Sequence, residues 1–245
     1  MKRTHALVSI GSLLLLLAFV SAAFATQISY TGYLPAPPVG SRTNWYRSVE
    51  LQQFDPSLGT LNFVRVTLSQ SLSGMISFEN MSTSDAVASA ELMSVMGLYS
   101  DYSSGVFSGL LASTTSTIST PTTTIAGAPA GGVSTTLPSP TYASGPGFFN
   151  SGLLASTSSQ TATPSDFSSW IGTGTVTYWG RARGMSGFEG GDNSGNVIFT
   201  SDAWADGAAT VVYDYNGTDV PEWNTLALAS LGAFAGLPFL RRRLR

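Results

Sequence analysis

Apolar and polar side chains alternate along most of the chain between its two ends. Residues 61–68, LNFVRVTL, place Val64, Val66 and Leu68 on one side of an extended chain and Arg65 and Thr67 on the other. A period of two is typical of a β-strand with one buried face, because successive side chains of a strand point to opposite sides. The sequences SGMISFEN, GTGTVTYWGRARG and AATVVYDYN repeat this pattern.

No segment shows a convincing charged amphipathic helix pattern. The nearest candidate, residues 84–97, has a Ser and Val content that suits a strand or a loop better. Short alternating runs bounded by Gly, Ser, Asn or Asp, without intervening helices, indicate an antiparallel fold. We therefore predict an all-β chain, an antiparallel β-sandwich of the jelly-roll or immunoglobulin-like Greek-key type.

The first 25 residues have the composition of a secretory signal peptide. Lys2 and Arg3 precede an apolar segment, residues 6–20, and Ala23 and Ala25 form a small-residue cleavage pattern. We expect an N-terminal signal helix, residues 1–25, that is cut after Ala25. The alternative is an uncleaved membrane anchor.

The predicted mature chain lacks three residue types that much enzyme chemistry requires. The only His and the only Lys precede Ala25, and the chain has no Cys. Mechanisms with a Ser-His-Asp triad or a Ser-Lys dyad are therefore excluded for it. Carboxylate pairs remain, and their candidates are Glu189, Asp192, Asp202, Asp206 and Asp214. Because nothing in their spacing requires a pair, we predict no enzyme, and a carboxylate-dependent glycoside hydrolase is a distant alternative.

The predicted mature body is acidic. Residues 26–219 hold five Arg and thirteen Asp or Glu, a net charge of −8. This balance argues against nucleic acid or an anionic lipid surface as its partner.

The C-terminal segment is apolar and ends in a basic block. Residues 225–240 would form a helix of about 24 Å, shorter than the ~30 Å hydrocarbon core of a bilayer. Arg241, Arg242 and Arg243 follow, and the positive-inside rule would keep them in the cytoplasm. We predict a C-terminal hydrophobic helix that holds the protein at the inner membrane, transiently or stably.

The same segment resembles a known sorting signal. Val220, Pro221 and Glu222, then the apolar helix and the arginines, are similar to the PEP-CTERM signal of Gram-negative bacteria, although Trp223 stands where a second Pro is usual. The resemblance implies processing of residues 220–245 by an exosortase-like enzyme and export to the cell surface or beyond. An ordinary tail anchor is the alternative.

Residues 26–219 resemble a choice-of-anchor E domain. The resemblance rests on residues 48–80, which include QFDPSLGTL and SLSG, on residues 167–179, and on the closing VVYDYNG. The resemblance implies a fold and an export destination but no catalytic activity. The DPSLG turn predicts a hairpin-like pair of the strands on either side of it, with Gln52 and Gln53 on the strand surface.

One stretch departs from the rest in composition. Residues 113–144 hold sixteen Ser or Thr in thirty-two positions and no charged residue. They are either a solvated Ser/Thr/Pro-rich insertion or, in part, an edge hairpin whose threonines favour β-structure. The sequence GLLAST occurs at residues 109–114 and again at 152–157, either as equivalent elements or by chance.

An oxygen-rich loop is the best candidate for a cofactor site. Asp192, Ser194 and Asn196 lie at alternate positions among glycines and suit Ca²⁺, but the full EF-hand pattern is missing. A plain strand connection needs the same residue types. We expect no cofactor, with calcium as the alternative.

Aromatic residues offer a route to ligand binding. Trp45, Tyr46, Trp170, Trp179 and Trp204 either form a platform for sugar rings or fill the core. The sequence thus predicts an exported bacterial cell-surface or extracellular-matrix protein with a structural or interaction role. Binding of a surface polysaccharide is the alternative function.

Overall fold

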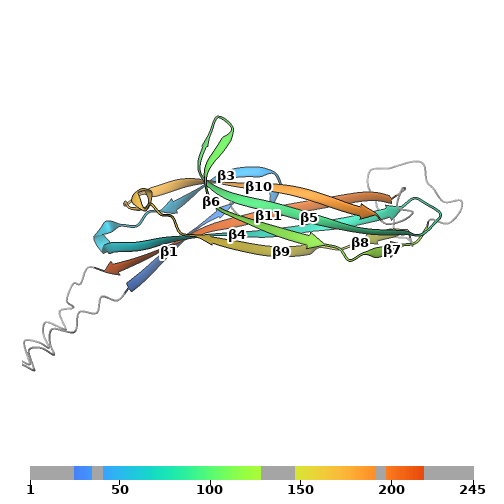
Figure 1. Ribbon diagram of the computed structural model, residues 1–245, viewed down its shortest axis with the longest axis horizontal. Helices are drawn as coiled ribbons and strands as arrows, with labels where there is room; N and C mark the ends of the chain where they lie inside the picture. The colour runs from blue at the N-terminus through green and yellow to red at the C-terminus, as the bar shows by residue number, and fades with distance from the viewer. Residues whose placement is uncertain (1–24, 35–40, 128–146, 191–196, 218–245) are drawn as a thin grey trace, which may run out of the picture. The chain divides into compact units, whose positions relative to one another are not determined.

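The computed structural model describes residues 25–34, 41–127, 147–190 and 197–217 (Figure 1). The predicted signal and C-terminal helices lie outside these ranges. Within them, no helix is long and apolar enough to span a membrane. The described residues form two 3-10 turns, η1 (Pro56–Leu58) and η2 (Ser168–Trp170), and otherwise strands and loops.

The strands form two sheets. Sheet A has the order β1-β11-β4-β8, with β2 beside β11 and β9 beside β4; sheet B has the order β3-β10-β5-β6, with β7 beside β5. The strands of sheet A are β1 (Ala25–Leu34), β2 (Ser41–Arg42), β4 (Gly59–Asn80), β8 (Phe148–Asn150), β9 (Leu154–Ala162) and β11 (Val197–Gly217). Those of sheet B are β3 (Trp45–Gln52), β5 (Ala86–Ser103), β6 (Val106–Ser119), β7 (Thr123–Ile125) and β10 (Thr175–Gly190).

Contacts divide the chain into two compact units, which we describe separately. The smaller comprises residues 1–26, 56–62 and 214–245. In its described part, Asn62 Nδ2 donates hydrogen bonds to Asp214 Oδ1 at 2.9 Å and to Asn216 Oδ1 at 3.1 Å. The larger, residues 27–55 and 63–213, holds most of both sheets and every site discussed below.

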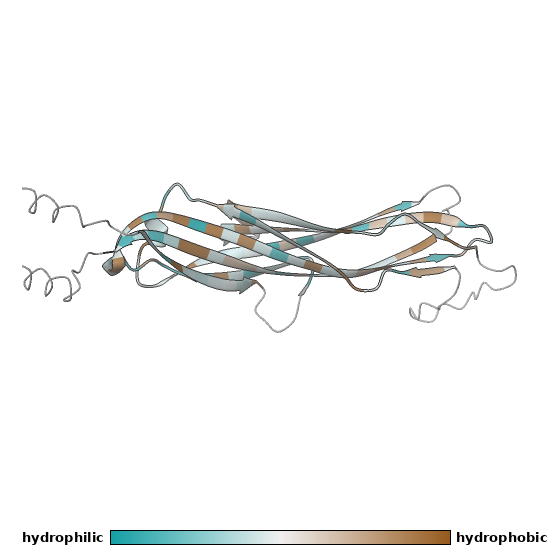
Figure 2. Ribbon diagram, turned by 90° about the horizontal axis from the view of Figure 1, so that it is seen from below, coloured by the Kyte–Doolittle hydropathy of each residue, from teal (hydrophilic) through white to brown (hydrophobic). Residues whose placement is uncertain are grey.

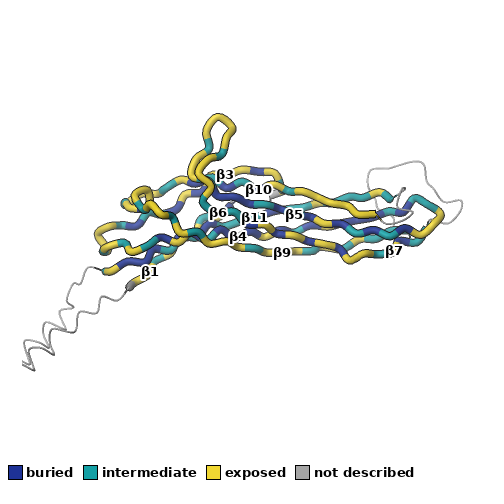
Figure 3. The backbone as a smooth tube through the Cα atoms, in the orientation of Figure 1, coloured by how far each residue is buried: buried dark blue, intermediate teal, exposed yellow. Residues whose placement is uncertain are grey.

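The period-two pattern marks the buried faces of the strands. Val64, Val66 and Leu68 are fully buried in β4, whereas Arg65 between them is exposed. Hydropathy and burial alternate along the strands of both sheets (Figures 2 and 3). Residues 86–97 belong to β5, so the preference for a strand over a helix is confirmed. The prediction of an antiparallel β-sandwich is confirmed as well.

The predicted pairing across the DPSLG turn is wrong. η1 occupies that turn, but the strands before and after it belong to different sheets: β3 pairs with β10, and β4 pairs with β8 and β9. A turn of this composition reverses the chain equally well within a sheet and between sheets. The partners of β3 and β4 lie far away in sequence.

Apolar side chains from both sheets fill the space between them. A cluster that includes Leu72, Ile76, Phe78 and Leu92 forms one part of this core. The indole nitrogen of buried Trp45, in sheet B, donates a 3.0 Å hydrogen bond to the Ala205 carbonyl in sheet A. This bond satisfies the polar atom of a buried ring and ties the sheets together.

The QQF sequence before η1 is held by the loop around η2. Gln52 Nε2 donates to the Gly174 carbonyl at 2.7 Å, and Gln53 Nε2 donates to the Ser169 carbonyl at 2.8 Å. The Phe54 amide donates to the carbonyl of Trp170 at 2.8 Å. The indole of Trp170 is buried and stacks on Tyr178 at 5.0 Å between ring centroids. The two glutamines therefore stabilise the fold through loop contacts.

The two GLLAST copies begin in the same backbone conformation. Gly109 and Gly152 have φ of +63° and +67°; Gly109 lies within edge strand β6 of sheet B, and Gly152 lies two residues before edge strand β9 of sheet A. In the Ser/Thr-rich stretch, residues 113–119 belong to β6 and residues 123–125 form β7, so this part is edge β-structure; both strands pair with β5 and not with each other, so they form no hairpin. Residues 128–146 lie outside the described ranges.

Candidate binding face on sheet B

Most of the predicted site residues lie outside the described ranges. These are Ala23, the sorting residues Val220, Pro221, Glu222, Trp223, Arg241, Arg242 and Arg243, and the calcium candidates Asp192, Ser194 and Asn196. Ala25 is the first residue of β1. Within the described part of the chain, no group of three or more His, Cys, Asp or Glu side chains is placed to hold a metal.

The five aromatic candidates separate into two groups. Trp45 and Trp170 are buried, 8% and 1% exposed, and belong to the core. Trp204 lies on β11, in the other sheet. Tyr46 on β3 is 48% exposed, and Trp179 on β10 is half-buried between the buried Tyr178 and Gly180. Tyr46 and Trp179 therefore lie on the outer face of sheet B, the face turned away from sheet A.

Three further rings join them in what we call the aromatic face: Tyr46, Tyr99, Tyr102, Phe107 and Trp179. The Tyr102 ring lies 4.9 Å from Tyr46, 5.0 Å from Trp179 and 4.5 Å from Phe107, measured between centroids, and it stacks on Phe107. Tyr99 lies 5.0 Å from Phe107. The rings thus form one continuous surface cluster.

A hydrogen bond links two phenols of this cluster. Bonding to the Tyr46 side chain, followed by desolvation, raises the pKa of the Tyr102 hydroxyl above its usual value. The neutral phenol is therefore retained to higher pH, and both hydroxyls remain at the surface as hydrogen-bonding groups.

The tip of the β5–β6 hairpin, residues 100–109, supplies two of the five rings. Its turn places Ser104 and Gly105 at positive φ, +51° and +82°, between the paired residues Ser103 and Val106, as in a type I′ turn. The tip projects from the sheet and is largely exposed (Figures 1 and 3). Tyr99, Tyr102 and Phe107 were not among the aromatic candidates predicted from the sequence, because composition does not tell an exposed ring from a buried one.

A glycine makes room for one ring. Gly97 is flanked by the buried Met96 and Leu98, so its Cα lies on the outer face of β5. A Cβ atom at Gly97 would approach the ring of Tyr99 to 2.7 Å, closer than carbon atoms pack. The Tyr99 ring therefore covers Gly97 and lies along the sheet.

Two arginines border the rings. Arg181 pairs in register with Tyr46 on one side and Gly97 on the other, and its guanidinium lies 5.0 Å from the centre of the Phe107 ring. Arg183, two residues on, is exposed and lies opposite Val95. This is a cation–π geometry at the rim of a surface of stacked rings.

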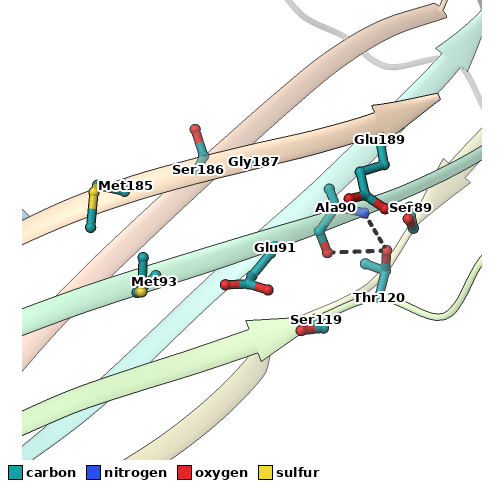
Figure 4. A pocket seen from close by; sticks show the side chains of 10 residues that line it. All are labelled: Ser89, Ala90, Glu91, Met93, Ser119, Thr120, Met185, Ser186, Gly187 and Glu189. Atoms are coloured by element: carbon teal, nitrogen blue, oxygen red, sulfur yellow. Dashed lines mark hydrogen bonds between the residues drawn. The ribbon is translucent and has the colours of Figure 1, made fainter.

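A groove of about 490 Å³ lies farther along the same two strands (Figure 4). It begins at Met93 and Met185 and ends at Thr120, whose side chain bonds the backbone of Ala90. Glu91 and Glu189 line it as diagonal neighbours on β5 and β10, a relationship that places their backbones about 7–8 Å apart. In Figure 4 their carboxylates point in different directions and do not converge on one point.

The remaining carboxylate candidates are dispersed. Asp202 and Asp206 lie four residues apart on β11, about 13 Å at ~3.3 Å per residue, beyond the range that glycosidases use. Asp202 forms a 3.9 Å ion pair with Arg42, and both side chains are largely exposed.

A second groove, of about 640 Å³, crosses the outer face of sheet A. Hydroxyl-bearing residues of β4 and β9, Asp206 and the exposed Tyr33 line it. It contains a single aromatic ring and no arginine, so it lacks the stacked surface found on sheet B.

Comparisons with known proteins do not indicate a function for this chain. No family model matches the chain, and no curated protein sequence matches it. A chain from Desmodium yellow mottle tymovirus is 9% identical over 81% of this chain and 86% of its own length, with a TM-score of 0.19. A chain from infectious bursal disease virus, Gx strain, is 10% identical over 86% of this chain, with a TM-score of 0.14. This chain spans about half (51%) of that viral chain. Likenesses this weak carry no argument.

Proposed function

We propose that this protein is an exported bacterial cell-surface or extracellular-matrix protein whose β-sandwich binds a polysaccharide through the aromatic face of sheet B. The observation that carries binding is the gathering of five rings from four strands on one outer sheet face. Flat rings with phenol hydroxyls at their edges suit a sugar, which has an apolar face and a rim of hydroxyls.

The proposal of export and sorting is supported by the sequence alone. The signal-peptide composition of residues 1–25, the resemblance to a choice-of-anchor E domain and the PEP-CTERM-like residues 220–245 support secretion and processing by an exosortase-like enzyme. In this proposal the C-terminal helix holds the chain at the inner membrane before it reaches the surface.

We also propose the jelly-roll topology for the sandwich. The pairs β1 and β2, β6 and β7, and β8 and β9 each share one edge position, so the described strands occupy eight positions. Numbered along the chain, these positions have the order 1-8-3-6 in one sheet and 2-7-4-5 in the other, which supports two Greek keys of the jelly-roll kind. A crystal structure with β3 paired to β4 would contradict it.

The binding proposal is tested by titrating the full chain with neutral and acidic polysaccharides and following heat and tryptophan fluorescence. Trp179→Ala and Tyr46→Ala are each expected to weaken binding about tenfold, the effect of losing one ring contact worth ~1.4 kcal/mol. Tyr33→Ala removes an exposed ring from sheet A and is the matched control. Thermal unfolding monitors the fold of every variant. Binding that depends on Tyr33, but not on Trp179 or Tyr46, would contradict the proposal.

Sorting is tested by fractionating cells that make the full chain or a variant lacking residues 220–245, and by weighing the mature protein. We expect the full chain to lose both terminal segments and to reach the cell exterior. An intact C-terminus in the inner-membrane fraction would show a stable tail anchor instead.

A further inference from the structure

We infer that the polysaccharide bound at the aromatic face is acidic, and that Arg181 and Arg183 bind the anionic groups on its rings. This inference rests on the proposed function and names the class of its ligand. The anionic group is either a carboxylate or a sulfate ester attached to a sugar ring, since both present negatively charged oxygens to an arginine.

The two arginines are free to bind an external anion. They lie two residues apart on the same side of β10, about 6.6 Å apart along the strand. Within the described ranges Arg42 forms an ion pair with Asp202 on sheet A, but no ion pair involves Arg181 or Arg183. A shortage of acidic residues does not explain this lack of partners, because residues 26–219 hold thirteen acids and five arginines.

The guanidinium of Arg181 is held in place before any ligand binds. It lies over the Phe107 ring, and the side chain is half-buried between the rings of the aromatic face. The guanidinium has five N–H donors, and Arg181 donates none of them to a described residue, so they are available for a carboxylate or sulfate oxygen. Preorganisation of this kind reduces the side-chain entropy lost on binding.

The neighbouring rings determine that the anion is carried by a sugar. Trp179 and Tyr46 flank Arg181 at adjacent register positions, Trp179 on the same strand and Tyr46 directly opposite. A ligand that reaches the arginine therefore also covers a ring. Inorganic anions cannot stack on the rings, and neutral sugars can accept hydrogen bonds from the arginines but lack the charge attraction.

Charges on the same sheet face limit how far an acidic chain can extend. Glu189 lies six residues beyond Arg183 on β10, about 20 Å away, and Glu91 lies diagonally across from it. These carboxylates would repel a polyanion, so we place the ligand at the arginine end of the face, over the rings.

The test compares two forms of one polymer: polygalacturonate and its fully methyl-esterified form, which has the same rings without the charge. We expect the full chain to bind the acidic form at least about tenfold more tightly, and the preference to weaken as NaCl is raised. Dextran sulfate beside dextran gives the same comparison for sulfate esters and shows which anion is preferred.

The variant Arg181→Gln/Arg183→Gln is expected to lose this preference while still binding the methyl-esterified polymer. Arg65→Gln is the matched control, because Arg65 also lies over a ring, 5.3 Å from the centre of Phe63, but on sheet A. A further chain with Arg241, Arg242, Arg243 and Arg245 replaced by Gln measures any contribution of the basic tail and is expected to keep the preference.

Three results would overturn the inference. Equal binding of both polymer forms, with dependence on Trp179 and Tyr46 intact, would leave the proposed function standing and remove the acidic specificity. A preference that survives in the double arginine variant would do the same. Binding of oligothymidylate as tight as that of polygalacturonate would assign the face to single-stranded nucleic acid. Loss of binding to every polysaccharide would instead overturn the proposed function.

Discussion

The hydroxyl of Thr114 donates a 2.9 Å hydrogen bond to the hydroxyl of Ser158, although the two residues lie in different sheets and 44 positions apart. Ser116 also pairs with Ser158, at 2.7 Å, and the Ser113 amide donates to Gln160 Oε1 at 2.9 Å. Edge strands β6 and β9 are therefore joined by side chains, and hydroxyl groups occupy inward positions where aliphatic ones are usual.

Two buried serines near this contact should respond in opposite ways to substitution by Ala. Ser94 is fully buried, and among the described residues its hydroxyl has no hydrogen-bonding partner, whereas the Ser116 hydroxyl is bonded. Because an unpaired buried hydroxyl costs free energy, we expect Ser94→Ala to raise the free energy of unfolding by about 1 kcal/mol and Ser116→Ala to lower it by about 1 kcal/mol. Urea unfolding measures both, and equal effects would contradict the hydrogen-bond assignment.

Substitution of Gly97 should affect binding more than folding. An Ala methyl group at Gly97 would meet the edge of the Tyr99 ring, which would have to swing away from the sheet. Because Tyr99 lies at the surface, we expect a loss of stability of about 1 kcal/mol and a several-fold loss of polysaccharide affinity. Gly187→Ala is the control, since a Cβ there meets nothing within 4 Å. Unchanged affinity in Gly97→Ala would place the ligand away from Tyr99.

The two left-handed glycines of the GLLAST copies should differ in their tolerance of Ala. Both substitutions require Ala to adopt positive φ, at a cost of about 1–2 kcal/mol. At Gly152 the added methyl group has open space, whereas at Gly109 it would collide with the Ser100 side chain. We therefore expect Gly109→Ala to destabilise the protein more than Gly152→Ala, as measured by thermal unfolding. The reverse order would contradict this assignment.

Stability should fall at alkaline pH because of a buried phenol. Burial, and then the neighbouring Tyr178 and Tyr30, raise the pKa of Tyr213, whose hydroxyl donates a 2.7 Å hydrogen bond to the Gln52 carbonyl. The unfolded chain loses this proton near the ordinary tyrosine pKa of about 10, while the folded chain keeps it. The contribution of Tyr213 to the free energy of unfolding is therefore complete below about pH 10. Above that pH it falls by up to about 1.4 kcal/mol per pH unit.

Tyr213→Phe tests this linkage. The variant should be less stable at pH 7 by about 1 kcal/mol, since it lacks the hydrogen bond, and should lose stability less steeply above pH 10. Urea unfolding at pH 7, 9, 10 and 11 compares the two slopes. Identical slopes would show that Tyr213 does not carry the alkaline sensitivity.

The sequence predicted the strands better than the partners of those strands. Alternation identified the buried faces of β4 and β11 because burial of one face is a local property of a strand. It did not separate β3 from β4, since pairing depends on strands more than a hundred residues away, such as β10. Local turn chemistry is the same in both arrangements.

The candidate site was predictable only in part. Tyr46 and Trp179 were among the aromatic candidates, but three of the five, Trp45, Trp170 and Trp204, lie in the core or on the other sheet. Composition does not tell an exposed ring from a buried one. Tyr102 and Phe107 are brought together by their pairing across the hairpin, and Arg181 lies beside the rings through its register with Tyr46.

The tip of the β5–β6 hairpin has a consequence for engineering. Residues 100–109 carry two of the five rings, yet they add nothing to the apolar cluster between the sheets. Grafting other ten-residue tips onto the same two strands should therefore yield a library of receptors with different sugar preferences on an unaltered frame.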